Sequence, residues 1–544
     1  MSLRNHEPSD GSPLLERLRR PLASLGLHLG LVGPLILPGC LPDDPYADDL
    51  DLLPPVSTRE SLAYVDQARH ELVVVRPEDD RLDILRRGVG DDRTTVLWSR
   101  ATLDGSHVMT LVAPASEKTE DIDEQLYLFP ADGEDDPQVY DVLAPFTGVA
   151  LSPDGRRAVL HFGSGVGSGA LQNANQVAIV PLDRAPGGEV VRNLTLNGFG
   201  GRLQSIQFPT PTGAEGPTAV DVGGRPLELV AFLAEGEVVL VDAGNELTDQ
   251  VAVRFGAEVG FSPEATLLRP GDEVFGKPVL FLRSSVGSDV AMLTLVDKSD
   301  EATGEPGFSA QVSLIPVGER ATDMATYNGA ETPYLVTVGS SAMIFTDIRT
   351  QGSFSVGTGA SVQNLFMRDA QTAAGTIKQA VAWASGGNAL YTLDLDDIEN
   401  TIGRTPEPLA IETGIQDLVV LDNDRVLVSS GLNLYVVDLP LSQVTPLSAQ
   451  SPYDARSSAL DGNRLLLGTP GQTWVSTVDL LTLNPESMVL DDAIGSFHYL
   501  PGAGKLVMVH ADPVGHLTVA DAQSPSRSSS YVAWGYLLDG MLDP

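Results

Sequence analysis

The chain contains 544 residues, carries a formal net charge of −39 and is 42% hydrophobic. A surface of this charge repels phosphate, so the composition argues against a nucleic-acid partner. The apolar share is large enough for a folded core, which excludes global disorder. The acidic residues are dispersed, which favours a solvated surface that would also suit divalent cations or basic partners.

The first 39 residues have the pattern of an export signal. Arginines precede residues 22–37, in which only a serine and a histidine are polar. A basic region followed by about 15 apolar residues is typical of a signal peptide. The run is shorter than the ~20 apolar residues of a membrane-spanning helix, and Pro21, Pro34 and Pro38 would interrupt a continuous helix. We therefore predict a signal peptide over residues 1–39.

The only cysteine of the chain, Cys40, directly follows this segment. With Leu37 three residues before the cysteine and Gly39 just before it, the site resembles a bacterial lipoprotein signal. The resemblance implies that Cys40 is lipidated and becomes the first residue of the mature protein, with several acyl chains for stable anchoring. An uncleaved anchor, an ordinary cleaved signal, and a buried helix with an incidental cysteine are the alternatives.

The residue after the cysteine also bears on localisation under this resemblance. Retention in the inner membrane is usually signalled by Asp at that position, and here it is Leu41. The resemblance therefore implies a cell-envelope protein in the outer membrane, on its periplasmic face or at the cell surface, rather than in the inner membrane.

Residues 40–58 comprise the lipidated cysteine and a segment rich in Pro and Asp, which indicates an extended tether. Its carboxylates could touch calcium, but their spacing does not match an EF-hand loop. We expect the folded domain over residues 59–538 and a short C-terminal tail over 539–544.

From about residue 60, short β-branched or alternating runs are separated by turn residues, which predicts an all-β fold. One element recurs at intervals of roughly 40 to 60 residues, as expected for four-stranded propeller blades. It is an alternating strand that ends near an Asp, which we expect to cap the following turn. The copies span residues 125–132, 176–183, 237–242, 342–347, 388–394, 433–438, 473–479 and 516–521.

A turn signal precedes one of these copies. Residues 152–156 read Ser-Pro-Asp-Gly-Arg, a sequence in which Pro presets φ and Gly accepts a positive φ. With this turn, the chain resembles the TolB-like and WD-repeat-like β-propellers. A degenerate copy is expected at 261–264, and residues 500–505 occupy the same place in the last repeat. We predict a single propeller, with eight blades favoured within a range of seven to ten and one blade split between the chain ends.

Candidate sites are few. His510 and His516 flank a turn that contains Asp512, so two imidazoles and a carboxylate could face each other and bind zinc. Histidines beside a strand turn are more often solvated or hydrogen-bonded. No metal, calcium or other cofactor site is marked by a motif, and no catalytic motif exceeds the background, so a non-enzymatic role is favoured.

These observations predict a lipid-anchored, extracytoplasmic β-propeller that acts as a binding or scaffolding module in the cell envelope. Blade loops would hold a protein or a small ligand without covalent chemistry. The alternative is a propeller-class hydrolase, lactonase-like or glycan-cleaving, that uses calcium or convergent carboxylates. A structural part of an envelope complex is a third interpretation.

Overall fold

The computed structural model describes residues 50–537, apart from short segments within that range. These segments are residues 116–122, 164–172, 188–189, 197–201, 213–218, 246–248, 257–259, 273–274, 299–306, 330–331, 373–374, 397, 400–404, 432, 448–457 and 513. The predicted signal peptide, Cys40 and the tail 539–544 lie outside the described residues. Tyr46–Pro544 forms one compact unit. In the described part, no helix has the length and apolar character needed to cross a membrane.

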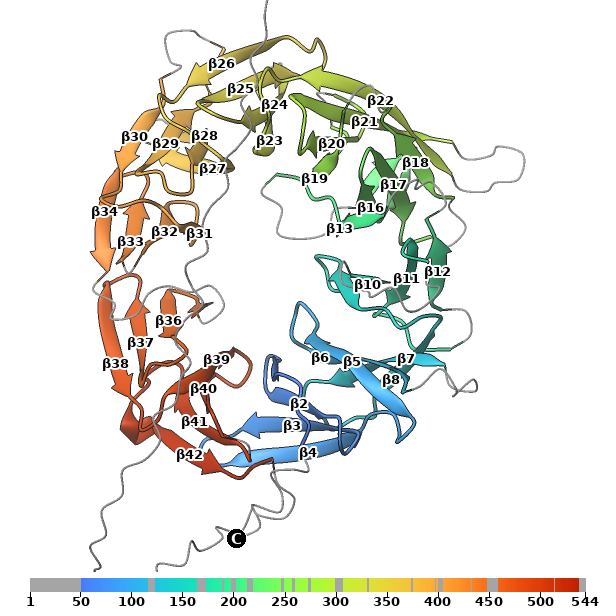
Figure 1. Cartoon of the computed structure of the whole chain (residues 1–544). Coiled ribbons are helices and arrows are strands. Elements are labelled where there is room, and N and C mark those ends of the chain that lie inside the picture. Colours follow the sequence, from blue (N-terminus) through green and yellow to red (C-terminus); the bar gives the residue numbers. More distant parts are fainter. Residues whose placement is uncertain are drawn as a thin grey trace, which may run out of the picture. The chain divides into compact units, whose positions relative to one another are not determined.

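The described residues form ten four-stranded antiparallel sheets arranged as a ring (Figure 1). The domain is a β-propeller, and its ten blades lie within the predicted range of seven to ten. In blades 4 to 8 and in blade 10, the strand that comes first in the chain lies on the inner side of the ring and the last lies outside (Figure 1). The first five blades are built as follows: blade 1 from β1 (Val56–Ser57), β2 (Leu62–Asp66), β3 (Glu71–Pro77) and β4 (Leu82–Gly88); blade 2 from β5 (Thr94–Ala101), β6 (His107–Pro114), β7 (Glu124–Pro130) and β8 (Gln138–Val142); blade 3 from β9 (Gly148–Leu151), β10 (Arg157–His161), β11 (Gln176–Pro181) and β12 (Arg192–Thr195); blade 4 from β13 (Leu203–Gln207), β16 (Leu229–Ala234), β17 (Glu237–Asp242) and β18 (Val251–Arg254); blade 5 from β19 (Pro263–Arg269), β20 (Val279–Ser284), β21 (Asp289–Asp297) and β22 (Phe308–Pro316).

The second half of the ring repeats this plan. Among the described residues, only blade 4, in the first half of the ring, carries an inserted hairpin, which is formed by β14 (Val220–Val222) and β15 (Arg225–Leu227). One 3-10 turn, η2 (Arg527–Ser529), precedes the last strand of blade 10. The remaining blades are: blade 6 from β23 (Asp323–Asn328), β24 (Pro333–Val338), β25 (Ala342–Asp347) and β26 (Ser353–Gly357); blade 7 from β27 (Asn364–Thr372), β28 (Gly375–Trp383), β29 (Ala389–Asp394) and β30 (Glu407–Ala410); blade 8 from β31 (Asp417–Val420), β32 (Arg425–Ser430), β33 (Asn433–Asp438) and β34 (Gln443–Leu447); blade 9 from β35 (Ser458–Asp461), β36 (Arg464–Gly468), β37 (Trp474–Asp479) and β38 (Asn484–Val489); blade 10 from β39 (Ile494–Leu500), β40 (Lys505–His510), β41 (His516–Asp521) and β42 (Ser530–Trp534).

The core is divided among the junctions between blades. Side chains alternate along a strand, so a strand buried on both faces supplies two neighbouring junctions. In β16, Val230 and Phe232 pack towards blade 3, whereas Ala231 and Leu233 pack towards blade 5. Ten hydrophobic clusters of described residues occupy the ten junctions in this way. Burial on both faces explains why the middle strands are continuous apolar runs.

The recurrent element of the sequence is the third strand of a blade. All eight predicted copies fall on third strands, and Asp438 and Asp479 accept hydrogen bonds from backbone N–H groups two or three residues later, which confirms that they cap turns. The third strands of blades 1 and 5, β3 and β21, are not among the predicted copies. The structure therefore has ten blades, whereas the sequence favoured eight. β3 ends in Pro77 instead of Asp, and β21 is longer than its counterparts.

The folded domain begins earlier than residue 59. Leu52 forms a bridge with Asp66, the Leu53 N–H donates to the Val65 carbonyl at 2.9 Å, and β1 pairs with β2. The abundance of Pro and Asp predicts that residues 50–57 belong to the tether, and this prediction is wrong. They belong to blade 1, since Leu50 and Leu52 pack against the junction between blades 10 and 1, and Leu53 packs against the junction between blades 1 and 2.

The ring closes without sharing a strand. β1 pairs with β2 and β42 pairs with β41, so the expected split blade is wrong. Closure depends on side chains at the junction of blades 10 and 1, called the closure seam below. Leu62 and Tyr64 of blade 1 pack there with Leu517 of blade 10 and with Tyr536, which follows β42.

Candidate functional site

The Ser-Pro-Asp-Gly turn joins β9 to β10, as the sequence predicted. The Gly155 N–H donates to the Ser152 carbonyl at 2.8 Å, and Gly155 has a φ of +69°, which glycine adopts without strain. Asp154 Oδ1 accepts from the Ser152 hydroxyl at 2.6 Å and from the Arg156 N–H at 3.1 Å. These bonds fix the turn and with it the position of Arg157, the first residue of β10. Residues 500–505 form the corresponding turn of blade 10, but residues 261–264 lead into the first strand of blade 5 instead.

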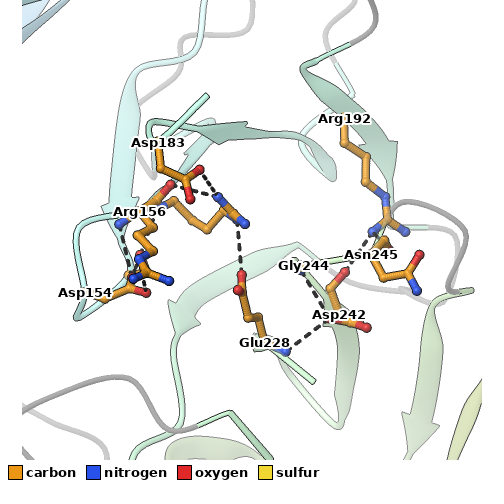
Figure 2. Close-up of polar contacts among 10 residues, drawn as sticks. Asp154, Arg156, Asp183, Arg192, Glu228, Asp242, Gly244 and Asn245 are labelled. Atoms are coloured by element: carbon orange, nitrogen blue, oxygen red, sulfur yellow. Dashed lines mark hydrogen bonds and ion pairs between the residues drawn. The ribbon is translucent and has the colours of Figure 1, made fainter. Parts of the chain in front are cut away.

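Arg157 bridges blades 3 and 4. Its side chain is 7% exposed, and its Nη1 donates to Asp183 Oδ1 at 2.6 Å within blade 3. Its Nε lies 3.2 Å from Oε2 of Glu228, which immediately precedes β16 of blade 4, but without hydrogen-bond geometry. Asp183 and Glu228 thus approach one guanidinium from the two blades (Figure 2). A buried cation of this kind requires such partners.

A second set of contacts secures the same junction. Arg192 of β12 donates through Nη1 to the carbonyls of Asp242 and Asn245, both at 2.9 Å. The buried Asp242 carboxylate accepts from the backbone N–H groups of Glu228 and Gly244, both at 3.1 Å (Figure 2). Burial raises the pKa of Asp242, and these backbone bonds act in the opposite direction. The backbone that carries Glu228 is therefore held firmly beside blade 3.

A pocket that is open to solvent lies at this junction and is called the junction pocket below. Its charged lining comes from Asp154 of the blade 3 turn, from Arg157 and from Glu228. Its other walls come from the segment after β13 and from residues beside β14 and β17. The lining residues are Ser152, Pro153, Asp154, Arg157, Phe208, Pro209, Thr210, Ala219, Glu228, Leu229 and Ala243.

The histidines singled out by the sequence lie in blade 10, on the opposite side of the ring from blade 4 (Figure 1). His510 and His516 do come together, with ring centroids 4.3 Å apart. His510 contacts the Ala493 carbonyl through Nδ1 at 2.9 Å and the Thr518 hydroxyl through Nε2 at 2.8 Å, so protein atoms occupy both ring nitrogens.

The other members of this cluster are also engaged. His516 stacks on Trp534 with centroids 3.4 Å apart, and burial lowers its pKa. Asp512 accepts the Val514 N–H at 2.9 Å. Across the described part of the chain, no three His, Cys, Asp or Glu side chains gather as a metal site would require. His510 is thus a hydrogen-bonded strand histidine and His516 a stacked one, and zinc at this turn stays a prediction.

His498 contributes to the closure seam. Its Nδ1 lies 2.6 Å from the Ser57 hydroxyl of blade 1, and its Nε2 lies 2.7 Å from the Ser496 hydroxyl. Burial lowers the pKa of His498 to about 4, so the imidazole is neutral at physiological pH. The seam thus contains a histidine that burial keeps in its uncharged form and that has a hydroxyl beside each ring nitrogen.

Sequence reasoning identified one part of the junction pocket and missed the rest. The Ser-Pro-Asp-Gly turn was predicted as a turn, and Asp183, which contacts Arg157 beside the pocket, was predicted as a strand-end Asp. Arg157 directly follows the predicted turn and could have been noticed as a basic residue at the start of an apolar strand. Glu228 and Phe208 carried no signal, because their role depends on which blades are neighbours.

Comparison with known proteins gives similarity of fold only. No protein-family model and no curated protein matches the chain. Similar solved structures include the dihydro-heme d1 dehydrogenase NirN in complex with DHE, with 12% identity over 76% of this chain and 71% of that one and a TM-score of 0.38. They also include the Dos1 propeller, with 14% identity over 66% and 89% and a TM-score of 0.38, and apo AztD from Citrobacter koseri, with 11% identity over 68% and 92% and a TM-score of 0.33. Such distant similarities carry no inference about function.

Proposed function

We propose that this protein is a lipid-anchored β-propeller that binds a partner outside the cytoplasm, as a module of the cell envelope. The observation that carries the proposal is the solvent-open junction pocket, where a rigid junction of two blades presents both charged and apolar groups. Recognition there would be non-covalent: the blades supply a fixed frame, and the turns supply the contacts.

The anchor in this proposal is Cys40, which follows a segment typical of a lipoprotein signal. An exported chain with one cysteine forms no internal disulfide, and lipidation would consume the thiol. Leu41 favours the outer membrane. Replacing Cys40 with Ala and fractionating the cells tests this step. We expect the variant to leave the membrane fraction, and continued membrane association through the N-terminus would contradict lipidation.

A photo-crosslinking experiment on the full-length protein in its membrane tests binding at the pocket. A photoreactive residue is placed at Ala219, which is exposed and lines the pocket. The matched control is Val286, which is 67% exposed in the turn between β20 and β21, outside the pocket lining. We expect a discrete adduct from position 219 and none from 286. No adduct, or equal adducts from both positions, would contradict a partner at the junction pocket.

A further inference from the structure

We propose that β22, the last strand of blade 5, is a docking site for an extended segment of a partner protein, which pairs with it as a fifth strand. The docked segment alternates apolar and polar side chains. This site is separate from the junction pocket and does not depend on the lipid anchor. The proposal follows from the outer edge of β22, from its composition and from an apolar row that ends on it.

β22 is an edge strand whose outer side has no partner in the described part of the chain. It has nine residues, lies on the outside of the ring (Figure 1) and pairs along its whole length with β21, on one side only. Every second N–H and C=O along such an edge points away from the sheet. Another extended backbone matches this row of donors and acceptors, as in peptides that add a strand to a sheet.

Most other blades protect their outer edge, whereas β22 is unprotected. Proline and charged residues on an edge strand oppose pairing with a further strand. Seven of the other nine last strands contain at least one of them, namely β4, β8, β12, β18, β30, β34 and β38. The remaining two, β26 and β42, have only five residues each. β22 is the longest last strand described, has no charged residue and has proline only at its final position.

An apolar row crosses blade 5 and ends on this edge. Its members are cross-strand neighbours in succession, one from each strand of the blade: Leu268, Leu280, Leu293 and Val312. The three leucines are fully buried, but Val312 is 46% exposed. An apolar side chain on a docked strand would continue the row and cover Val312, because directly opposite side chains pack together across paired strands.

The two faces of β22 set the pattern of the docked segment. Ala310, Val312 and Leu314 share one face, since side chains alternate along a strand, and Ala310 and Leu314 pack against the core cluster between blades 4 and 5. On the opposite face, Gln311 is exposed and Ser313 is polar. A segment that extends both faces is therefore apolar at every second position and polar between.

A second copy of the chain fits this edge poorly. Each copy carries a formal net charge of −39, so two copies repel each other when they are brought edge to edge. A segment of a different protein avoids this repulsion. Basic residues beside its paired part would add attraction at long range and raise the association rate.

Binding of a synthetic peptide tests the proposal. The probe is the acetylated and amidated peptide Lys-Thr-Val-Thr-Val-Thr-Val-Thr-Lys, titrated into the full-length protein in detergent micelles. We expect saturable binding and slower hydrogen exchange of β22 amides, because pairing shields N–H groups that otherwise face solvent. Val312→Lys should weaken binding at least tenfold, since a lysine on an edge opposes pairing. Val489→Lys, at a position 59% exposed in the last strand of blade 9, is the matched control and should stay within twofold.

Backbone methylation of the probe tests strand pairing without any change in the protein. In an extended peptide, the N–H groups of the valines and those of the threonines point to opposite edges. N-methylation of one set therefore blocks one edge only. We expect at least tenfold weaker binding for one methylated peptide and a change within threefold for the other.

Three results would overturn the proposal. They are no saturable binding of the probe, equal binding by the wild type and Val312→Lys, and equal effects of the two methylations. Sedimentation of the protein alone adds a fourth, because a dimer that Val312→Lys dissociates would place a second copy on β22. The measurements involve neither Cys40 nor position 219, so their failure leaves the proposed function standing, and the reverse also holds.

Discussion

The closure seam and the junction of blades 3 and 4 join neighbouring blades by different means. At the seam, the Tyr64 and Tyr536 hydroxyls share a hydrogen bond of 2.8 Å, and the Tyr531 hydroxyl donates to the Arg81 carbonyl at 2.6 Å. Its buried polar contacts are thus largely between neutral groups. At the other junction, a buried guanidinium links Asp183 and Glu228, and a pocket opens beside it.

The difference follows from chain connectivity. Blades 3 and 4 are consecutive in the chain, so the covalent connection keeps them close, and their junction can accommodate a buried charge and a cavity. Blades 10 and 1 contain the two ends of the folded domain, so only non-covalent contacts hold them together. Neutral, well-packed contacts avoid the desolvation penalty of buried ions. A binding site is therefore better placed at a connected junction than at the seam.

Leu517→Ala should have the largest effect, because it leaves a cavity in the closure seam. Leu517 is fully buried, and such substitutions cost about 2–5 kcal/mol. Leu196→Ala, in the cluster between blades 3 and 4, is the matched control. Hydrogen exchange should show loss of protection in blades 1 and 10 for Leu517→Ala only. Similar exchange in both variants would mean that the seam is no more critical than other junctions.

Lowering the pH should weaken the seam through His498. Its pKa is about 4 in the folded protein and about 6.5 when unfolded, so the unfolded chain binds the proton more tightly. The stability contribution is complete above pH 6.5 and falls by about 1–3 kcal/mol as the pH drops to 4. Urea unfolding of the wild type and of His498→Asn across this pH range measures the effect. If the unfolding free energy depends on pH equally in both proteins, His498 is excluded as the cause.

Tyr536→Phe should destabilise the seam by about 1–2 kcal/mol, because it leaves the buried Tyr64 hydroxyl without its hydrogen-bond partner. Burial raises the pKa of Tyr64 to about 12, so this hydroxyl stays neutral at physiological pH. The double variant Tyr64→Phe/Tyr536→Phe should regain part of the loss. Strict additivity of the two substitutions in denaturant unfolding would show that the hydroxyls do not interact.

Arg157→Met should change stability by no more than about 1 kcal/mol. The methionine occupies much of the buried volume, and water can solvate Asp183 and Glu228, each more than one-third exposed. Thermal unfolding of Arg157→Met, measured together with Leu517→Ala, checks this prediction. If Arg157→Met loses as much stability as Leu517→Ala, the Arg157 contacts are essential for holding blades 3 and 4 together.

Lys505→Met should have the smallest effect. Lys505 Nζ contacts Asp79 Oδ1 across the seam at 2.9 Å, but the Asp79 side chain is 96% exposed, and exposed ion pairs contribute little. We expect no measurable change in the urea midpoint. A clear destabilisation would show that surface charges, and not only the buried cluster, hold the ring closed.

Much of the fold could be predicted because its signals are local. The alternating third strands and the Ser-Pro-Asp-Gly turn each depend on a few consecutive residues, whose periodicity and turn chemistry set their conformation. Recognition failed where the local signal changed, as in β3, where Pro77 replaces the strand-end Asp. The seam could not be predicted in this way, since Tyr64 and Tyr536 meet across almost the whole folded domain.

The sequence by itself determined an acidic all-β chain of repeated blades, behind a segment typical of a lipoprotein signal. The tertiary structure decided that there are ten blades, that they close without a shared strand, and that Arg157 meets Glu228. The reason is physical: strand and turn preferences act between near neighbours in the chain, whereas closure and the junction pocket arise from packing between blades.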